Sequence, residues 1–238
     1  MQSALKIEPA TGLVTGVRQV LSPHFDARPS GVLPELIVVH GISLPPGEFG
    51  GPWIDRLFTG GLPAEVHPYF RDIARIRVSA HALIRRDGIL VQYVSFGQRA
   101  WHAGQSHYRG RAACNDFSIG IELEGTDDIP YTDPQYDQLG ALVEALLDAY
   151  PSLSSDHIVG HSDIAPGRKT DPGPSFDWER WRTILRSRGR ASAASASVAN
   201  TSSESSSAGS RARYRGADPH ASISRTTPRV RRVRSPRS

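Results

Sequence analysis

Three short apolar runs have the length and composition of buried β-strands. They span residues 36–39, 119–123 and 157–160. Short runs rich in β-branched residues, bounded by glycine or polar residues, are typical of strands whose faces are covered. The first run ends at His40 and the third at His161. Each of these two strands therefore delivers a histidine to the point where a loop opens, which is where sites usually form.

Two further patterns predict sheet structure. Residues 78–95 predict a hairpin, because Asp87-Gly88 stands between two apolar runs. In residues 119–124 apolar positions alternate with others, so Glu122 and Glu124 are expected on the face opposite the apolar side chains. That face is either plain solvent or a cleft in which burial raises the pKa of Glu122 toward a value useful for proton transfer. The sequence leaves both open.

The clearest helix is predicted to begin at Asp133 as its capping residue, with Pro134 in the first turn, and to end before Pro151. Its apolar face predicts core packing and no chemistry. The residues on that face are Tyr136, Leu139, Leu142, Val143, Leu146, Leu147 and Tyr150. Shorter amphipathic helices are predicted for residues 52–58, 67–73 and 178–185.

Charge divides the chain of 238 residues near residue 186. Residues 187–238 hold 11 arginines against Glu204 and Asp218, whereas residues 1–186 hold 17 basic and 22 acidic residues. The pI of about 9.5 therefore belongs to the C-terminal segment. That segment has too few apolar residues for a core, so we expect a disordered basic tail. Its 230–234 cluster is either a solvated extension or a contact for RNA, DNA or anionic lipid. The acidic remainder argues against nucleic-acid binding by the protein as a whole.

Cysteine usage and hydropathy bear on the compartment. Cys114 is the single cysteine, which excludes an intramolecular disulfide and fits a reducing environment. Residues 1–9 lack an apolar stretch long enough for the centre of a secretion signal, and no run elsewhere is long enough to span a membrane. We therefore expect a cytoplasmic protein that makes no membrane contact.

The loop at residues 160–174, GHSDIAPGRKTDPGP, carries the densest candidate chemistry. Proline and glycine restrict its backbone, so Lys169 and Asp171 can be held in place without helix or sheet. Two interpretations stay open from this loop alone. Either His161, Asp163 and Asp171 cap turns, or part of this set binds a metal.

Two histidines and one carboxylate are the ligands that a catalytic zinc takes, with the fourth position left to water. His40, His161 and Asp171 fit that count. Structural zinc would need cysteines that the chain lacks. In this hypothesis Glu122 accepts a proton from the attacking water, and Lys169 offers positive charge to the oxyanion of an amide under attack.

The RAWHAG segment at residues 99–104 places Trp101 and His102 in a glycine-bounded loop. Such a loop is suited to stacking on a sugar or contacting a peptide, and an aromatic lid over the core is equally compatible with these residues. His102 is also the alternative metal ligand if Asp171 does not bind.

Five motifs together resemble the 1,6-anhydro-N-acetylmuramyl-L-alanine amidases of Gram-negative bacteria. They are VVHGISLPPGEFGGPWID, RVSAHALIRRDG, RAWHAG, CNDFSIGIELEGTD and GHSDIAPGRKTDPGP, and the similarity runs from about Val14 to Leu185. The resemblance implies the type 2 amidase fold shared with peptidoglycan recognition proteins, an α/β (α+β) fold with a mixed central β-sheet flanked by helices. It divides the chain into an N-terminal extension (1–13), a catalytic domain (14–186) and the basic tail (187–238).

The resemblance also implies a reaction: zinc-dependent hydrolysis of the amide between the lactyl group of 1,6-anhydro-N-acetylmuramic acid and L-alanine, in peptidoglycan recycling. It implies His40, His161 and Asp171 as Zn²⁺ ligands, and Glu122 and Lys169 as catalytic residues. The expected partner is a small molecule, an anhydro-muropeptide, and we expect a monomer.

The resemblance is less specific about substrate contacts. Four residues are assigned to substrate binding: Arg77, Trp101, His102 and Arg111. Arg77 matches a position able to pair with stem-peptide carboxylates through its guanidinium group. The chain departs from its close relatives at Gly41, where they carry Asn, and at Ala113, where they carry a basic residue. Both positions are expected to face substrate, so the departures bear on the preference for the stem peptide.

Two other functions stay open. One is a broad-specificity N-acetylmuramoyl-L-alanine amidase of the wall, which would need export. The other is a muropeptide-binding module without activity. Binding-only proteins of this fold lose a zinc ligand, whereas this chain keeps all three ligands together with Glu122 and Lys169.

Overall fold

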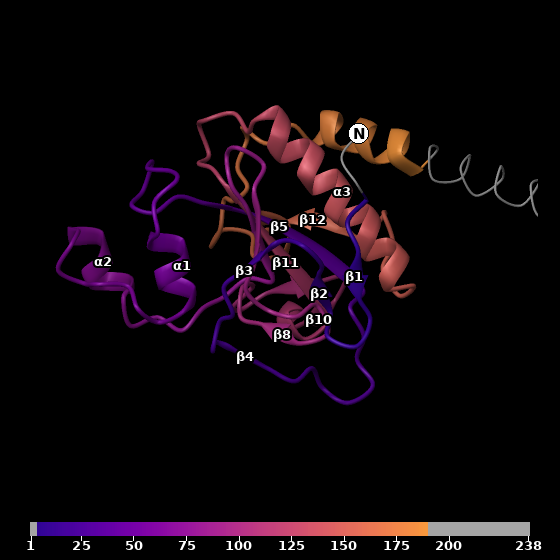
Figure 1. Ribbon diagram of the computed structural model, residues 1–238, viewed down its shortest axis with the longest axis horizontal. Helices are drawn as coiled ribbons and strands as arrows, with labels where there is room; N and C mark the ends of the chain where they lie inside the picture. Colours follow the sequence, from indigo (N-terminus) through magenta and orange to yellow (C-terminus); the bar gives the residue numbers. More distant parts are fainter. Residues whose placement is uncertain (1–3, 190–238) are drawn as a thin grey trace, which may run out of the picture. The chain divides into compact units, whose positions relative to one another are not determined.

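The computed structural model describes residues 4–189, in which six strands form one mixed sheet (Figure 1). In spatial order they are β12 (Ile158–Gly160), β5 (Leu36–Ile42), β11 (Ser118–Glu124), β6 (Ala82–Ile84), β7 (Leu90–Gln92) and β3 (Arg18–Gln19). β12, β5, β11 and β6 are parallel, β7 returns antiparallel to β6 through the predicted hairpin, and β3 runs parallel to β7. The predicted mixed sheet is confirmed, and the three apolar runs are neighbours in it.

Short strand pairs and helices surround this sheet. The pairs are β1 (Ile7–Glu8) with β2 (Leu13–Val14), β4 (Phe25–Asp26) with β8 (Arg99–Ala100), and β9 (His107–Tyr108) with β10 (Arg111–Ala112). The helices are α1 (Trp53–Phe58), α2 (Pro68–Ile73), α3 (Asp133–Ala149), α4 (His161–Ile164), a 3-10 turn η1 (Cys114–Asp116) and residues 178–189. The predicted helices at 52–58, 67–73 and 178–185 are therefore confirmed.

Helix α3 covers one face of the sheet (Figure 1). Its predicted apolar stripe packs on the side chains that β5 and β11 send to that face, among them Ile37 and Ile121. Full burial of one such side chain contributes roughly 1.5–3 kcal/mol, so this stripe is a main source of stability. The predicted cap at Asp133 is wrong. Thr132 is the N-cap, because its hydroxyl accepts from the backbone N–H of Gln135 while the Gln135 side chain accepts from the backbone N–H of Thr132.

The opposite face of the sheet carries the alternate residues of the same strands. Helices α1 and α2 lie on this side, away from α3, and pack on β6 and β7 (Figure 1). Beside them, Leu36 and Val38 of β5 pack against Cys114 and Phe117 near η1. Because side chains alternate along a strand, His40 and Glu122 share this second face.

Part of the predicted N-terminal extension, residues 1–13, is folded against the catalytic domain. β1 folds back onto β2 around Gly12, whose backbone N–H donates to the carbonyl of Glu8, and Ile7 is buried in the α3 core. A two-residue strand is too short to be read from sequence. The C-terminal helix runs on to residue 189, and the rest of the predicted tail lies outside the described residues. In residues 4–189, no helix is long and apolar enough to cross a bilayer.

Candidate metal centre and active-site cleft

The site forms where the parallel strands β5, β11 and β12 end. His40 lies near the end of β5, and Glu122 of β11 is its direct neighbour in the strand register. His161 follows β12 immediately and opens α4. The carboxyl ends of parallel strands meet at one edge of a sheet, so the fold gathers three residues separated by up to 121 positions.

Three donor atoms converge at this edge. The Nδ1 atoms of His40 and His161 are 3.0 Å apart, and Asp171 Oδ2 lies 3.2 Å from the first and 3.0 Å from the second. His40 and His161 are 1% and 3% exposed. The backbone N–H of Ser162 donates to the carbonyl of Asp171, which ties the proline-rich loop to the start of α4.

The three inward atoms are all able to donate a lone pair to a metal. Burial lowers the pKa of His40 to about 4, so its ring is neutral at neutral pH and carries a single N–H. Its outer atom Nε2 lies 2.9 Å from His102 Nδ1, and His161 Nε2 lies 3.3 Å from the carbonyl oxygen of Ala103. Burial alone would raise the pKa of Asp171, but contacts with His161 and His40 hold it well below its ordinary value.

This donor set fits a cation such as zinc. Zinc bonds of about 2.0–2.1 Å in a tetrahedral shell place donors about 3.3 Å apart, close to the 3.0–3.2 Å found here. Two imidazole nitrogens favour a transition metal over Ca²⁺ or Mg²⁺, which prefer oxygen ligands. His40, His161 and Asp171 are also the group of the described residues whose donor atoms lie close enough for a metal, all within 4.8 Å of one another.

Glu122 and Glu124 differ although they point to the same face of β11. Glu124 is 1% exposed, and its carboxylate accepts from the backbone N–H groups of Gly50 and Arg86 and pairs with Arg85. Glu122 is 9% exposed, and its Oε2 is buried without a hydrogen-bond partner. Burial first, and the nearby Asp171 charge second, raise the pKa of Glu122 well above 4.5. Glu124 is therefore structural, whereas Glu122 is poised to exchange a proton.

A cleft of about 720 Å³ opens onto these groups. Its polar end holds the three donor residues, Glu122 and Lys169, and its walls are largely apolar. The apolar walls include Leu44, Leu57, Phe58, Tyr69, Ile73 and Val78. A second cavity of about 960 Å³, between α3, β12 and the helical residues 178–189, contains none of the predicted site residues. We therefore assign the chemistry to the smaller cleft.

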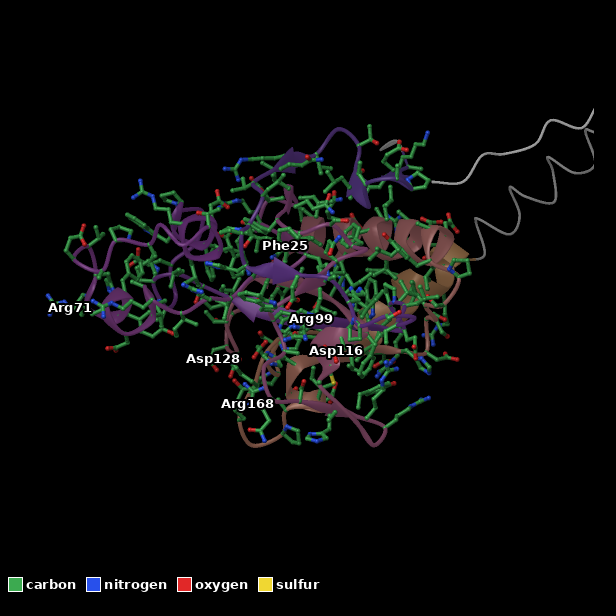
Figure 2. The ribbon with its side chains drawn as sticks, turned by 90° about the horizontal axis from the view of Figure 1, so that it is seen from below. Phe25, Arg71, Arg99, Asp116, Asp128 and Arg168 are labelled. Carbon is green, nitrogen blue, oxygen red and sulfur yellow. The ribbon has the colours of Figure 1, made fainter. Side chains whose placement is uncertain are left out.

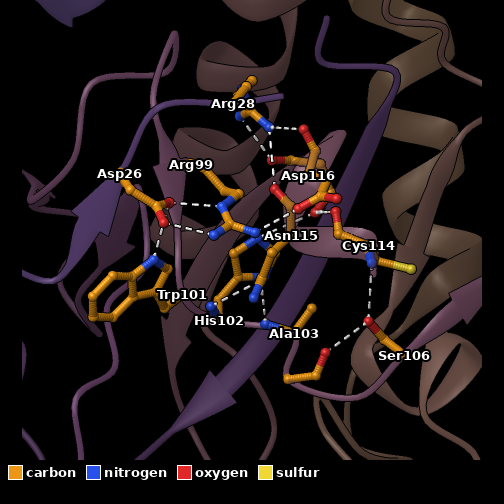
Figure 3. A network of polar contacts seen from close by, with 12 residues as sticks. Asp26, Arg28, Arg99, Trp101, His102, Ala103, Ser106, Cys114, Asn115 and Asp116 are labelled. Atoms are coloured by element: carbon orange, nitrogen blue, oxygen red, sulfur yellow. Dashed lines mark hydrogen bonds and ion pairs between the residues drawn. The ribbon is translucent and has the colours of Figure 1, made fainter. Parts of the chain in front are cut away.

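Lys169 is exposed on the loop of Asp171 and lines the cleft. Figure 2 shows its neighbour Arg168 well separated from Arg71, which lies in the last turn of α2. Trp101 forms part of the cleft wall, and its indole N–H donates to Asp26, 3.2 Å away (Figure 3).

Two other residues predicted to contact substrate, Arg77 and Arg111, do not line the cleft. Arg77 is exposed between Ile76 and Val78, which line the cleft, but is not itself a lining residue. Arg111 lies outside the cleft, where it pairs with Glu35 and covers the Phe117 ring.

His102 reaches the cleft wall, but both of its ring nitrogens are engaged, with His40 and Ser118. Its position fits orientation of a ligand histidine better than direct contact with substrate. It also lies behind His40, so it does not replace Asp171 in the donor set.

The remaining loop residues separate into two groups. Asp163 does cap a turn, because its carboxylate accepts from the backbone N–H of Gly160, 2.7 Å away. His161 and Asp171 belong to the donor set. Of the two departures noted in the sequence, Gly41 lines the cleft, whereas Ala113 is exposed in a left-handed turn that is not part of the lining.

Sequence reasoning missed several residues that support the site without lining the cleft. The amide oxygen of Asn115 accepts from the backbone N–H groups of His102 and Ala103, and Ser118 contacts the His102 ring. Tyr131 packs over Gly41 and donates to the carbonyl of Pro172, next to Asp171. A serine opening an otherwise apolar strand was the one available signal. The others depend on tertiary contacts.

Comparison with known proteins places this site in a family. The family model described as N-acetylmuramoyl-L-alanine amidase matches residues 30–174, which include all three donor residues, Glu122 and Lys169. This chain belongs to the N-acetylmuramoyl-L-alanine amidase family. This match confirms the resemblance of the five motifs to amidases.

Particular amidases of this family are similar over nearly their whole length. The 1,6-anhydro-N-acetylmuramyl-L-alanine amidase AmpD of Escherichia coli (strain K12) is 63% identical over 174 residues, 73% of this chain and 94% of that protein. AmpD of Haemophilus influenzae is 54% identical over 175 residues, 74% and 95%. A crystal structure of a selenomethionine derivative of AmpD superposes with a TM-score of 0.72 at 62% identity, and the match covers 74% of this chain and 97% of that one.

Proposed function

We propose that the chain hydrolyses the amide between the lactyl group of 1,6-anhydro-N-acetylmuramic acid and the L-alanine of the stem peptide, in peptidoglycan recycling. The observation that carries this proposal is the convergence of His40, His161 and Asp171 beside an unpartnered Glu122 in an amidase-family cleft. Similarity to AmpD proteins over 94–95% of their length supports this substrate over other muropeptides.

We assign the metal as Zn²⁺, held by His40, His161 and Asp171. Bound there, zinc supplies a Lewis acid that lowers the pKa of water to about 7. Glu122 would accept a proton from the attacking water as the water oxygen bonds to the amide carbonyl carbon. Glu122 then returns the proton to the nitrogen as the carbon–nitrogen bond breaks, so the products are the lactyl carboxylate and a free amine. Burial raises the pKa of Glu122, which favours binding of this proton.

Other residues of the cleft bind and orient the substrate. Lys169 places its ammonium group beside the carbonyl oxygen, where negative charge develops during attack. The apolar walls and Trp101 hold the sugar ring and exclude water. Arg77, next to the cleft, pairs with carboxylates of the stem peptide. Arg111 is left out of this scheme because of its position.

We propose a cytoplasmic location and a monomer that acts on a small muropeptide. The single cysteine, Cys114, is buried and free, which suits a reducing compartment. Cell fractionation with an antibody against the chain tests the location, and light scattering of the pure protein tests the oligomeric state.

The reaction is tested by mass spectrometry of products from two substrates, anhydro-muramyl tripeptide and the corresponding muramyl tripeptide without the anhydro bond. Each is incubated with and without a chelator. Free tripeptide from the anhydro substrate alone, lost on chelation and restored by zinc, is the expected result. Cleavage of both substrates would indicate a broad wall amidase. Binding without cleavage of either would indicate a recognition module.

A further inference from the structure

Both donor histidines depend on one short segment, His102–Ala103. The outer nitrogen of His40 contacts the side chain of His102, and the outer nitrogen of His161 contacts the main-chain carbonyl of Ala103. A carbonyl can only accept, so the Nε2 atom of His161 carries a proton, and in the neutral tautomer Nδ1 is then the atom with the free lone pair. Two adjacent residues thus orient two ligands that stand 121 positions apart.

The proton on His40 follows from a chain of contacts that also ends at a carbonyl. The Ser118 hydroxyl donates its single proton to the carbonyl of Cys114, 2.6 Å away. Ser118 can therefore only accept from His102 Nε2, 3.2 Å away, so His102 Nδ1 carries a lone pair. That lone pair accepts from His40 Nε2, and the His40 Nδ1 lone pair is directed to the metal position.

The His102 ring is fixed in this role by its packing. It fills the space above Gly120 of β11, where a Cβ atom would lie 2.4 Å from the ring. The ring is partly buried between the strand and the side chain of His40, which it meets edge to face at a centroid distance of 5.0 Å. Its orientation therefore depends on where the backbone of the segment is held.

Asn115 holds that backbone. Its side-chain oxygen accepts from the N–H of His102 at 3.1 Å and from the N–H of Ala103 at 2.8 Å (Figure 3). The turn that presents Asn115 is anchored in turn by Arg28, a largely buried guanidinium that donates to the carbonyls of Asn115, Asp116 and Ser118. One amide oxygen thereby secures both outer partners of the metal ligands.

We infer that Asn115 is a positioning residue for the metal site: it holds His102–Ala103 so that His40 and His161 both present Nδ1 lone pairs to the metal. The inference rests on the proposed function. Asn115 works here only as an acceptor of two N–H groups. An aspartate, which has the same shape and a stronger acceptor, should therefore replace it, whereas an alanine should not.

The experiment measures zinc affinity by competition with a chromophoric chelator for the full chain and two variants, Asn115→Ala and Asn115→Asp. We expect Asn115→Ala to bind zinc about 10–100-fold more weakly, the usual consequence of losing support behind a ligand, and Asn115→Asp to stay within a few-fold of wild type. Equal affinity of Asn115→Ala and wild type would overturn the inference. So would an equal loss in both variants, because general damage to the turn would explain it.

A second measurement needs no metal. Nitrogen-15 NMR of the imidazole rings in the metal-free protein should show His40 and His161 with the proton on Nε2 in wild type and in Asn115→Asp, and mixed tautomers in Asn115→Ala. Unchanged tautomers in Asn115→Ala would overturn the inference. If wild type binds no zinc, the proposed function fails, and the tautomers still decide the role of Asn115.

Ser118→Ala tests the contacts that orient His40 separately from those that orient His161. It also tests the inference if Asn115→Ala does not fold. It removes the acceptor for His102 and leaves Asn115 and Ala103 untouched. We expect mixed tautomers for His40 alone, with His161 unchanged. A tautomer change of the same size at His161 would contradict the inference that the two histidines are oriented through separate contacts.

Discussion

The donor cluster of the site, formed by His40, His161 and Asp171, contrasts with the exposed rim that carries Lys169 and Arg77. The donor histidines are buried and every ring nitrogen has a neighbour, so their directions are set before any ligand arrives. Lys169 and Arg77 are exposed, and none of the ion pairs found in residues 4–189 includes either of them. In the proposed reaction, the fold therefore sets the positions of the metal ligands in advance and leaves contact with the peptide to exposed side chains.

The largest effect is expected from breaking the donor cluster itself. Asp171→Ala removes a ligand and leaves two histidine lone pairs facing each other. We expect zinc affinity to fall by more than about a hundredfold, beyond the usual cost of losing support behind a ligand, and turnover to fall to background. Metal analysis after dialysis and product assay measure both. Stoichiometric zinc in this variant would mean that the third ligand lies elsewhere.

Glu122→Gln should separate metal binding from proton transfer. Because Glu122 is not a donor, zinc should be retained, while kcat should fall by about 10²–10⁴-fold with the loss of the general base. Wild-type kcat/KM should also fall as pH drops below the raised pKa of Glu122, since the base is then protonated. Turnover of Glu122→Gln near the wild-type rate would refute the assigned role.

The same substitution should stabilise the metal-free protein. Burial raises the pKa of Glu122, so the folded state binds this proton more tightly than the unfolded state does. The ionised carboxylate therefore lowers the free energy of unfolding, a cost that is absent below the ordinary value of 4.5 and complete above the raised pKa. We expect Glu122→Gln to melt at a higher temperature, by a margin that widens as pH rises from about 4.5. Glu124→Gln is the matched control and should melt lower, because its carboxylate is fully partnered.

Lys169→Ala tests the rim residue that the proposed reaction places beside the amide carbonyl oxygen. We expect kcat to fall by about a hundredfold through loss of charge at the oxyanion, with zinc affinity and melting temperature nearly unchanged because the side chain is exposed. Lys169→Arg should recover part of the rate. A loss confined to KM would instead assign Lys169 to substrate binding.

Gly41→Ala tests how tightly the cleft is built behind the donors. A Cβ atom there would lie 2.3 Å from the Tyr131 hydroxyl, which now donates to the carbonyl of Pro172. We expect a loss of about 1–3 kcal/mol in the free energy of unfolding, measured by denaturant titration. In a Tyr131→Phe background the hydroxyl is gone, so the same substitution should cost less. An equal cost in both backgrounds would exclude this contact as the cause.

The smallest effects should come from the outer rim. Arg77→Ala is expected to raise KM by roughly fivefold, since a solvent-exposed ion pair contributes about 1 kcal/mol or less, with kcat unchanged. Arg111→Ala is the matched control and should change neither constant, because Arg111 pairs with Glu35 outside the cleft. A larger effect for Arg111 than for Arg77 would contradict the assignment of the stem-peptide contact to Arg77.

The sequence by itself determined the main elements and named the candidate site residues. Apolar runs predicted β5, β11 and β12, and the periodicity of residues 136–150 predicted α3. Histidines at two strand ends and the aspartate of the loop at residues 160–174 predicted the donor set. These signals are local, because side-chain alternation and chain direction follow from backbone geometry within one element.

Only the tertiary structure decided which residues hold the site together. It distinguished Glu122 from Glu124, placed His102 behind His40 and placed Arg111 outside the cleft. It also brought the Asn115 side chain to the backbone of His102 and Ala103. Each of these outcomes depends on partners many positions away in the chain. No local pattern encodes whether a buried oxygen finds an N–H, because that depends on how separate elements pack.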